Sequence, residues 1–107
     1  MPAVPAVQLG KDASGSPVRM PLAGLGTGGY WAGNDSAVYA GVRQALTLGY
    51  RHLDTALGYR TQASLAKAVA DSGVPRAELF ILSKIPGGLD GQVSVLDFGF
   101  ILTYTEG

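Results

Sequence analysis

The feature that most constrains this chain is a regular alternation of short apolar runs and amphipathic helical segments between residues 22 and 85. Strands are predicted at residues 22–27, 50–55 and 79–83, because each is a short apolar run bounded by glycine or turn-forming residues. Helices are predicted in the two intervals between them. Strands that alternate with helices through short connections are typical of a parallel α/β unit with right-handed crossovers. The sequence therefore predicts an α/β fold.

The ends of both helices are marked in the sequence. The first follows Asn34-Asp35-Ser36, which supplies N-cap chemistry, and its apolar residues recur at helical spacing until Gly49. The second begins at Thr61 and is stopped by Ser-Gly-Val-Pro at residues 72–75. Ahead of the first strand, two apolar runs flank a segment rich in turn-forming residues at 11–16. These runs predict a hairpin, which its prolines confine to an edge.

The alternation stops after about residue 85. Residues 85–107 contain no Lys, Arg or His, hold five glycines and show no helical periodicity. A chain of 107 residues is one domain at most. We therefore assign residues 1–88 to the α/β domain and residues 89–107 to a divergent tail.

Composition and charge exclude other classes of protein. Eight basic residues balance eight acidic ones and are scattered, so the charge pattern of a nucleic-acid binder is missing. The absence of cysteine excludes a disulfide framework and a thiol nucleophile, and no metal site is predicted. The N-terminus lacks the pattern of a signal peptide, and no apolar run reaches the roughly 20 residues of a membrane helix. We expect a cytoplasmic protein without nucleic-acid or membrane partners, and the sequence predicts no oligomeric state.

One glycine motif suggests a dinucleotide site. Residues 24–29 match G-x-G-x-x-G after a predicted strand, and Asp54 follows 25 residues later. In a Rossmann-type fold the last glycine opens the helix, whose N-terminus then faces the pyrophosphate. Here residues 30–33 separate the glycines from the helix cap. A Rossmann-type dinucleotide-binding fragment is therefore the third interpretation, and a tight strand-to-helix loop is the simpler one.

A second group of residues suggests proton transfer. Asp54 and Lys84 end neighbouring predicted strands, and parallel strands about 4.8 Å apart place such residues side by side. Tyr59 lies in the loop after Asp54 and can fold back over the same edge. An ammonium beside a phenol favours loss of the phenol proton, and a carboxylate would hold that ammonium charged and aimed. The alternative is three surface residues with no shared purpose.

Three segments of the chain resemble the aldo-keto reductase family. Residues 49–56, Gly-Tyr-Arg-His-Leu-Asp-Thr-Ala, resemble its signature, and residues 20–27 and 72–84 resemble its first-strand and third-strand segments in the same order. The resemblance implies an N-terminal hairpin plus the first three β/α units of a TIM (β/α)8 barrel, which is incomplete in this chain. It also implies an NADP(H)-dependent oxidoreductase that reduces aldehydes or ketones to alcohols by hydride transfer.

The resemblance also implies roles for individual residues. Tyr59 would be the catalytic proton donor, Lys84 the cation that favours loss of its proton, and Asp54 the carboxylate that pairs with Lys84 and lies near the nicotinamide. Gly26, Thr27 and Asp54 would line the cofactor NADP(H). The partner implied is a small-molecule carbonyl substrate.

The chain departs from the family pattern in several places. Gly28 stands where an aromatic residue is common, and Ala66 stands where the signature usually ends in glycine. The only histidine, His52, lies inside the second strand and is expected to be a packed strand residue. Nothing after Lys84 resembles the family's catalytic histidine or most of its cofactor site. We therefore expect the chain alone to be inactive, and the alternative is a non-enzymatic fragment that binds no cofactor.

Overall fold

The computed structural model describes residues 4–31 and 33–85, which begin with an antiparallel hairpin of β1 (Ala6–Lys11) and β2 (Pro17–Pro21). In its turn, the Asp12 carboxylate accepts hydrogen bonds from the Ser14 hydroxyl (2.6 Å) and from the backbone N–H groups of Ser14 (2.9 Å) and Ser16 (3.0 Å). The bond from the Ser14 hydroxyl, followed by that from Ser16, holds the pKa of Asp12 below its usual value. The predicted hairpin is confirmed.

The centre of the fold is a three-stranded parallel sheet in the order β3–β4–β5. Its strands are β3 (Leu25–Gly26), β4 (His52–Asp54) and β5 (Phe80–Leu82). Consecutive strands are neighbours, as the predicted α/β unit requires. Each strand is shorter than the apolar run that predicted it, because pairing between neighbours extends only over these residues.

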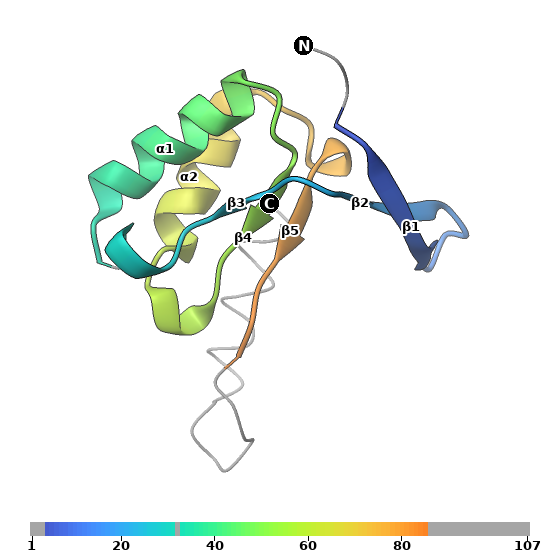
Figure 1. Ribbon diagram of the computed structural model, residues 1–107, viewed down its shortest axis with the longest axis horizontal. Coiled ribbons are helices and arrows are strands. Elements are labelled where there is room, and N and C mark those ends of the chain that lie inside the picture. The colour runs from blue at the N-terminus through green and yellow to red at the C-terminus, as the bar shows by residue number, and fades with distance from the viewer. Residues whose placement is uncertain (1–3, 32, 86–107) are drawn as a thin grey trace.

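Two helices connect the strands and lie together on one side of the sheet (Figure 1). In α1 (Asp35–Thr47), the Asn34 side chain caps the helix by accepting a hydrogen bond from the Ala37 N–H at 3.1 Å. Helix α2 (Gln62–Ser72) ends at Gly73, whose φ of 75° lies in the left-handed region that glycine adopts without steric cost. Both predicted helix ends are therefore confirmed.

Three short 3-10 helices were not predicted, because a single turn carries no periodicity. They are η1 (Gly29–Trp31), η2 (Leu57–Tyr59) and η3 (Arg76–Glu78). The first two follow β3 and β4 directly, so they shape the loops at the carboxyl ends of these strands.

The strand register sorts side chains onto two faces of the sheet. One row of aligned residues packs against the helices and consists of Leu25, Leu53 and Ile81. Successive side chains of a strand point to opposite faces. The next row, Gly26, Asp54 and Leu82, therefore lies on the face that the helices do not cover.

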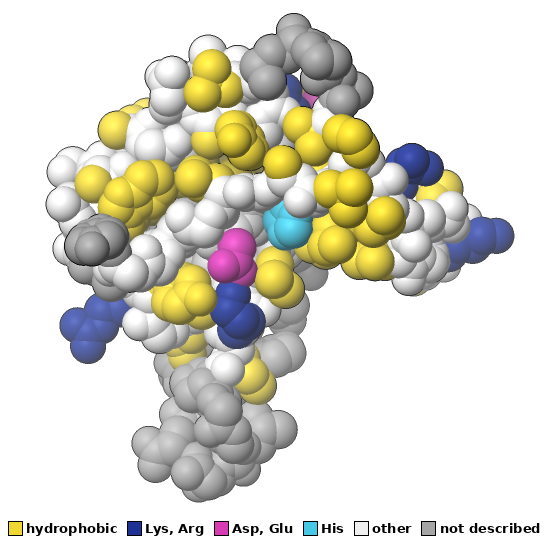
Figure 2. Space-filling view, viewed as in Figure 1, with side chains coloured by type: hydrophobic (Ala, Val, Ile, Leu, Met, Phe, Trp, Pro, Cys, Tyr) yellow, Lys and Arg dark blue, Asp and Glu magenta, His cyan; other side chains and the backbone are white. Residues whose placement is uncertain are grey.

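The hydrophobic core lies between the sheet and the two helices. Its buried residues are Val38, Val42, Leu46, Leu53, Leu65, Ala68, Val69 and Leu79. Hydrophobic side chains also reach the surface over the sheet and the hairpin (Figure 2). The large exposed ones are Val7, Leu9, Leu22, Leu48 and Leu82. The described residues thus bury one side of the sheet and leave apolar groups exposed elsewhere.

Neither α1 nor α2 is long and apolar enough to cross a membrane, and no other helix of the described residues is either. The predicted tail at residues 89–107 and its boundary at residue 88 lie outside the described residues.

Candidate active site

Asp54 and Lys84 meet at the carboxyl ends of neighbouring strands, as the sequence predicts. The Lys84 ammonium donates a hydrogen bond to the Asp54 carboxylate and another to the backbone carbonyl of Thr55, at 3.1 Å. Both partners are partly exposed, with 42% of the Lys84 side chain and 30% of the Asp54 side chain accessible to solvent. Such a pair contributes about 1 kcal/mol or less to stability, so its value lies in placing a positive charge.

The ion pair has a defined effect on titration. Burial acts to lower the pKa of Lys84, but the hydrogen bond and charge of Asp54, with a further contribution from Tyr59, raise it above its usual value of 10.5. Because the folded-state pKa is the higher one, the stabilisation is fully present below pH 10.5 and is lost as the pH rises through the raised pKa. Lys84 is therefore a cation at neutral pH.

Tyr59 lies beside this cation. It ends η2, whose first residue, Leu57, donates a backbone hydrogen bond to the Lys84 carbonyl at 3.0 Å. The Lys84 Nζ lies 5.0 Å from the centroid of the Tyr59 ring, within the range of a cation–π contact. Directly after Tyr59, Arg60 adopts a left-handed conformation with φ of 58°, which is uncommon for a residue with a side chain. The structure thus brings Asp54, Tyr59 and Lys84 together at one edge of the sheet.

The two other predicted cofactor residues lie on either side of Asp54. Gly26 is exposed and is the register partner of Asp54 in β3. Thr27 is completely buried, and both its backbone N–H and its hydroxyl donate to the Asp54 carbonyl at 3.0 Å. Because no part of Thr27 is exposed, contact between Thr27 and a cofactor stays a prediction.

His52 is packed within the sheet, as predicted. Its Nδ1 lies 2.8 Å from the Pro21 carbonyl oxygen, and because a carbonyl only accepts, Nδ1 donates the hydrogen bond. Its ring meets the ring of Phe80 edge-on, with centroids 4.9 Å apart. A Cβ at Gly24 would lie 2.8 Å from the His52 Cγ, so the first glycine of the loop makes room for this ring. His52 therefore ties the hairpin to the sheet.

The glycine motif at residues 24–29 does not open a helix. The short η1 follows it, and α1 begins only at Asp35. Gly24 and Gly28 instead allow close approach of the His52 and Tyr59 rings. This geometry excludes the Rossmann-type interpretation, in which the last glycine must start the helix.

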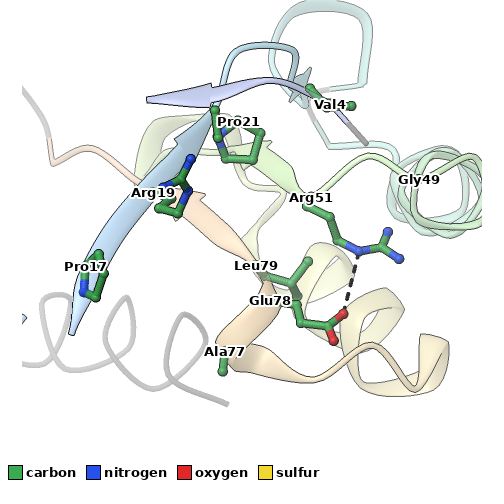
Figure 3. Close-up of a pocket in the computed structure, with 10 residues that line it drawn as sticks. Val4, Pro17, Arg19, Pro21, Gly49, Arg51, Ala77, Glu78 and Leu79 are labelled. Carbon is green, nitrogen blue, oxygen red and sulfur yellow. Dashed lines mark ion pairs between the residues drawn. The ribbon is translucent and has the colours of Figure 1, made fainter. Parts of the chain in front are cut away.

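A cavity of about 490 Å³ lies at the opposite, amino-terminal ends of β4 and β5, beneath the hairpin (Figure 3). Arg19, Arg51 and Glu78 are among the residues that line it. Arg51 Nε lies 3.9 Å from Glu78 Oε2, and the same guanidinium donates to the carbonyl oxygens of Leu46 and Tyr50. None of the predicted site residues lines this cavity. The candidate chemistry is therefore at the carboxyl ends of the strands and not in this cavity.

Within residues 4–31 and 33–85, no three His, Cys, Asp or Glu side chains are grouped so that they could hold a metal ion.

The contacts that the sequence did not predict are made by threonines. Thr27, Thr55 and Thr61 are each at most 1% exposed, and their hydroxyls bond to one another. No spacing rule predicts such a cluster, because the three residues come from three separate loops.

Gly28 is expected to control where the Tyr59 ring lies. A Cβ at this position would lie 3.0–3.2 Å from three atoms of that ring, so Gly28→Ala should displace the ring by a few tenths of an ångström. The half-buried ring can yield, so the free energy of unfolding should change by less than about 1 kcal/mol. The measurement is the NMR shift of the Tyr59 ring protons, assigned with Tyr59→Phe. Gly26→Ala is the matched control, because outside the adjacent residues its Cβ would make only an ordinary contact, 3.8 Å from Asp54 Oδ2, and equal shifts in both variants would contradict the contact.

The comparisons with known proteins agree with this geometry. Residues 22–97 match the sequence model of the Aldo/keto reductase family. This match extends past residue 88, the predicted boundary between the α/β domain and the divergent tail. The chain is 48% identical over 68 residues to methylglyoxal reductase DkgB of Salmonella typhi, covering 64% of this chain and 24% of that protein. It is 43% identical over 67 residues to glycerol 2-dehydrogenase (NADP(+)) of Saccharomyces cerevisiae, covering 63% and 20%.

Solved structures give the same result. The Bombyx mori aldo-keto reductase in complex with NADP matches with a TM-score of 0.74 and 28% identity, over 99% of this chain and 36% of that one. An aldo/keto reductase of Brucella melitensis matches with a TM-score of 0.72 and 28% identity, over 98% and 38%. The chain belongs to the aldo/keto reductase family. Its fold is the predicted one, an N-terminal hairpin and the first part of a (β/α)8 barrel with an unclosed sheet. It spans about a quarter or less of the curated relatives named above.

Proposed function

We propose that this chain carries the proton-donating part of an NADP(H)-dependent carbonyl reductase site, with Tyr59 as the proton donor. The observation that carries the proposal is the position of the Lys84 ammonium. It is held by the Asp54 carboxylate and the Thr55 carbonyl, and it lies 5.0 Å from the centroid of the Tyr59 ring. A cation held beside a phenol stabilises the phenolate that is left when the phenol donates its proton.

Each of the three residues has one task in the proposed reaction. The Tyr59 hydroxyl donates its proton to the oxygen of the substrate carbonyl as negative charge develops there. The Lys84 ammonium stabilises the phenolate that remains, because an opposite charge nearby favours the ionised form. Asp54 holds that ammonium in place and takes no proton itself. Bound NADPH would supply the hydride that reduces the carbonyl carbon.

The residues at this edge fit the nicotinamide end of such a cofactor. Gly26 is exposed next to Asp54, and even an added Cβ there would lie no closer than 3.8 Å to the carboxylate oxygen Oδ2. This leaves bare backbone beside the carboxylate, against which a planar ring can lie. The proposed cofactor residues at this edge are therefore Gly26 and Asp54, with the buried Thr27 supporting the Asp54 backbone from behind. Support for the cofactor comes from the relatives, one of which was solved in complex with NADP.

The proposed substrates are small aldehydes or ketones. A relative is named a methylglyoxal reductase and another a glycerol 2-dehydrogenase (NADP(+)), so both names refer to small carbonyl–alcohol pairs. The three proposed catalytic residues bind no particular substituent of the carbonyl compound, so they define the reaction class and leave the choice among carbonyl compounds open.

The proposal is tested by placing this site in a complete barrel. Residues 22–85 replace the corresponding segment of DkgB from Escherichia coli O157:H7, which is 47% identical to this chain over 68 residues. The chimera is expected to oxidise NADPH with 4-nitrobenzaldehyde, followed by absorbance at 340 nm. Tyr59→Phe should lower kcat by at least about 100-fold, the usual contribution of a general acid. A folded chimera that is inactive, or one whose rate survives Tyr59→Phe, would contradict the assigned role.

The second candidate is a non-enzymatic fragment, favoured by exposed Leu22 and Leu82. The 107-residue chain itself, mixed with NADPH and the same aldehyde, tests this candidate. A change in NADPH fluorescence together with a rate that Tyr59→Phe removes would rule it out. No fluorescence change, together with binding of the hydrophobic dye ANS, would support it for the chain alone.

A further inference from the structure

Three buried threonine hydroxyls form a connected group beneath the candidate site. Thr27 follows β3, Thr55 follows β4 and Thr61 precedes α2, and their side chains are at most 1% exposed. The Thr61 hydroxyl oxygen lies 2.7 Å from that of Thr27 and 2.9 Å from that of Thr55. The group therefore joins three loops at the carboxyl ends of the strands.

The direction of these hydrogen bonds is fixed by counting protons. Each hydroxyl has one proton, and a carbonyl can only accept. Thr27 Oγ1 donates its proton to the Asp54 carbonyl at 3.0 Å, so the bond between Thr27 and Thr61 must be donated by Thr61. The proton of Thr61 is then used, so Thr55 donates to Thr61. The result is a one-way hydroxyl chain, Thr55 to Thr61 to Thr27 to the Asp54 carbonyl.

Thr61 belongs to the hydroxyl chain, although its position is one at which a threonine usually caps a helix. It is the N-cap residue of α2, where a threonine side chain usually bonds to a free backbone N–H of the first turn and stabilises the helix by about 1 kcal/mol. Here the side chain makes no such capping bond. Its hydroxyl is fully used between Thr27 and Thr55.

The hydroxyl chain ends at the Asp54 carbonyl, which belongs to the part of the backbone that holds Lys84. The Asp54 carbonyl receives two hydrogen bonds from Thr27, through its hydroxyl and its backbone N–H. The same residue binds the Lys84 ammonium through its carboxylate, and the next carbonyl, that of Thr55, accepts a second bond from Lys84. Any rotation of the backbone at Asp54 would therefore break bonds to both Thr27 and Lys84.

We propose that the hydroxyl chain of Thr55, Thr61 and Thr27 is a positioning device that fixes the Asp54–Thr55 backbone and, through it, the Lys84 ammonium beside Tyr59. The proposal rests on the proposed function only for what the ammonium does to Tyr59. The titratable groups that act on Lys84 are Asp54 from β4 and Tyr59 from η2. The three threonines are positioning residues and do not touch substrate.

The test follows the titration of Lys84 in the 107-residue chain. The chain has only three lysines, Lys11, Lys67 and Lys84, so the Nζ and Cε signals of isotopically labelled lysine can be assigned with Lys84→Arg. Thr61→Val keeps the side-chain shape but removes the middle hydroxyl, and it is expected to lower the titration midpoint of Lys84. Thr61→Ser restores the hydroxyl and should restore the wild-type midpoint. Far-UV circular dichroism checks the fold at each pH.

The control is Thr47→Val, which removes an exposed hydroxyl that bonds only to the Arg43 carbonyl, at 3.0 Å, and should leave the Lys84 midpoint unchanged. If Thr61→Val does not fold, Thr55→Val removes only the first donor and should lower the midpoint less. An unchanged midpoint in a folded Thr61→Val or Thr55→Val variant, or a serine variant that behaves like valine, overturns the proposal. This measurement of the Lys84 midpoint needs neither cofactor nor turnover. Its outcome is therefore independent of the rate measured for Tyr59→Phe in the chimera.

Discussion

Leu53→Ala is expected to lower the free energy of unfolding by about 3–4 kcal/mol, a large part of the stability of a domain of this size. Leu53 is completely buried in the central strand and belongs to the same core cluster as residues of both helices. Truncation removes apolar contacts and leaves a cavity that the flanking strands and helices cannot fill without moving. Urea denaturation measures the change, followed by the fluorescence of the single tryptophan, Trp31, which packs against this core.

Leu82→Ala is the matched control for this experiment. It makes the same chemical change in the neighbouring strand, but Leu82 is 42% exposed and lies on the face that the helices do not cover. The expected loss is below about 1 kcal/mol, because little surface is returned to water. Equal losses in the two variants would show that the helix-covered face is not the core.

Lys84→Met is expected to lower kcat of the chimera by about 100-fold or more at neutral pH. The substitution keeps an unbranched apolar chain but removes the cation that lies 5.0 Å from the centroid of the Tyr59 ring and is bonded to Asp54. The phenol then has no positive charge to stabilise its ionised form, so donation of its proton becomes harder. KM for the aldehyde should change much less, because the ammonium acts on the proton transfer. Steady-state kinetics with 4-nitrobenzaldehyde separates the two constants.

Lys67→Met is a close control for the loss of charge. The Lys67 Nζ also lies over a tyrosine ring, 5.3 Å from the centroid of Tyr39, but on the helices and away from the candidate site. Its substitution should leave kcat within about twofold, as expected for a surface change. A similar loss in both variants would mean that the effect of Lys84→Met reflects damage to the fold.

The parts of the fold that follow from local chemistry were predictable. Asn34 marked the start of α1, and Gly73 marked the end of α2, because caps depend on one residue and its own backbone. The meeting of Asp54 and Lys84 also followed, because parallel strands present their carboxyl ends at one edge. These predictions required only single cap residues and the order of the elements.

The remaining features depend on distances between loops, which a single sequence does not contain. The bonds between the hydroxyls of Thr27, Thr55 and Thr61 require three loops to converge. The approach of Gly28 to Tyr59 likewise depends on how the loop that contains η2 lies against the segment after β3. Both features depend on distances between side chains that are defined to within less than the width of one atom. The pattern of strands and helices in the sequence does not specify distances that precisely.

The alternation of side chains along β4 has a consequence for how this segment can change. Leu53 faces the helices and Asp54 faces the open side, and they are consecutive residues of one three-residue strand. Inserting or deleting a single residue ahead of them would exchange their faces, turning a carboxylate into the core and a leucine into the candidate site. The stability and the chemistry of this strand therefore depend on the same alternation of side chains between the two faces of the sheet. Substitutions can alter either one separately, whereas a one-residue shift would remove both at once.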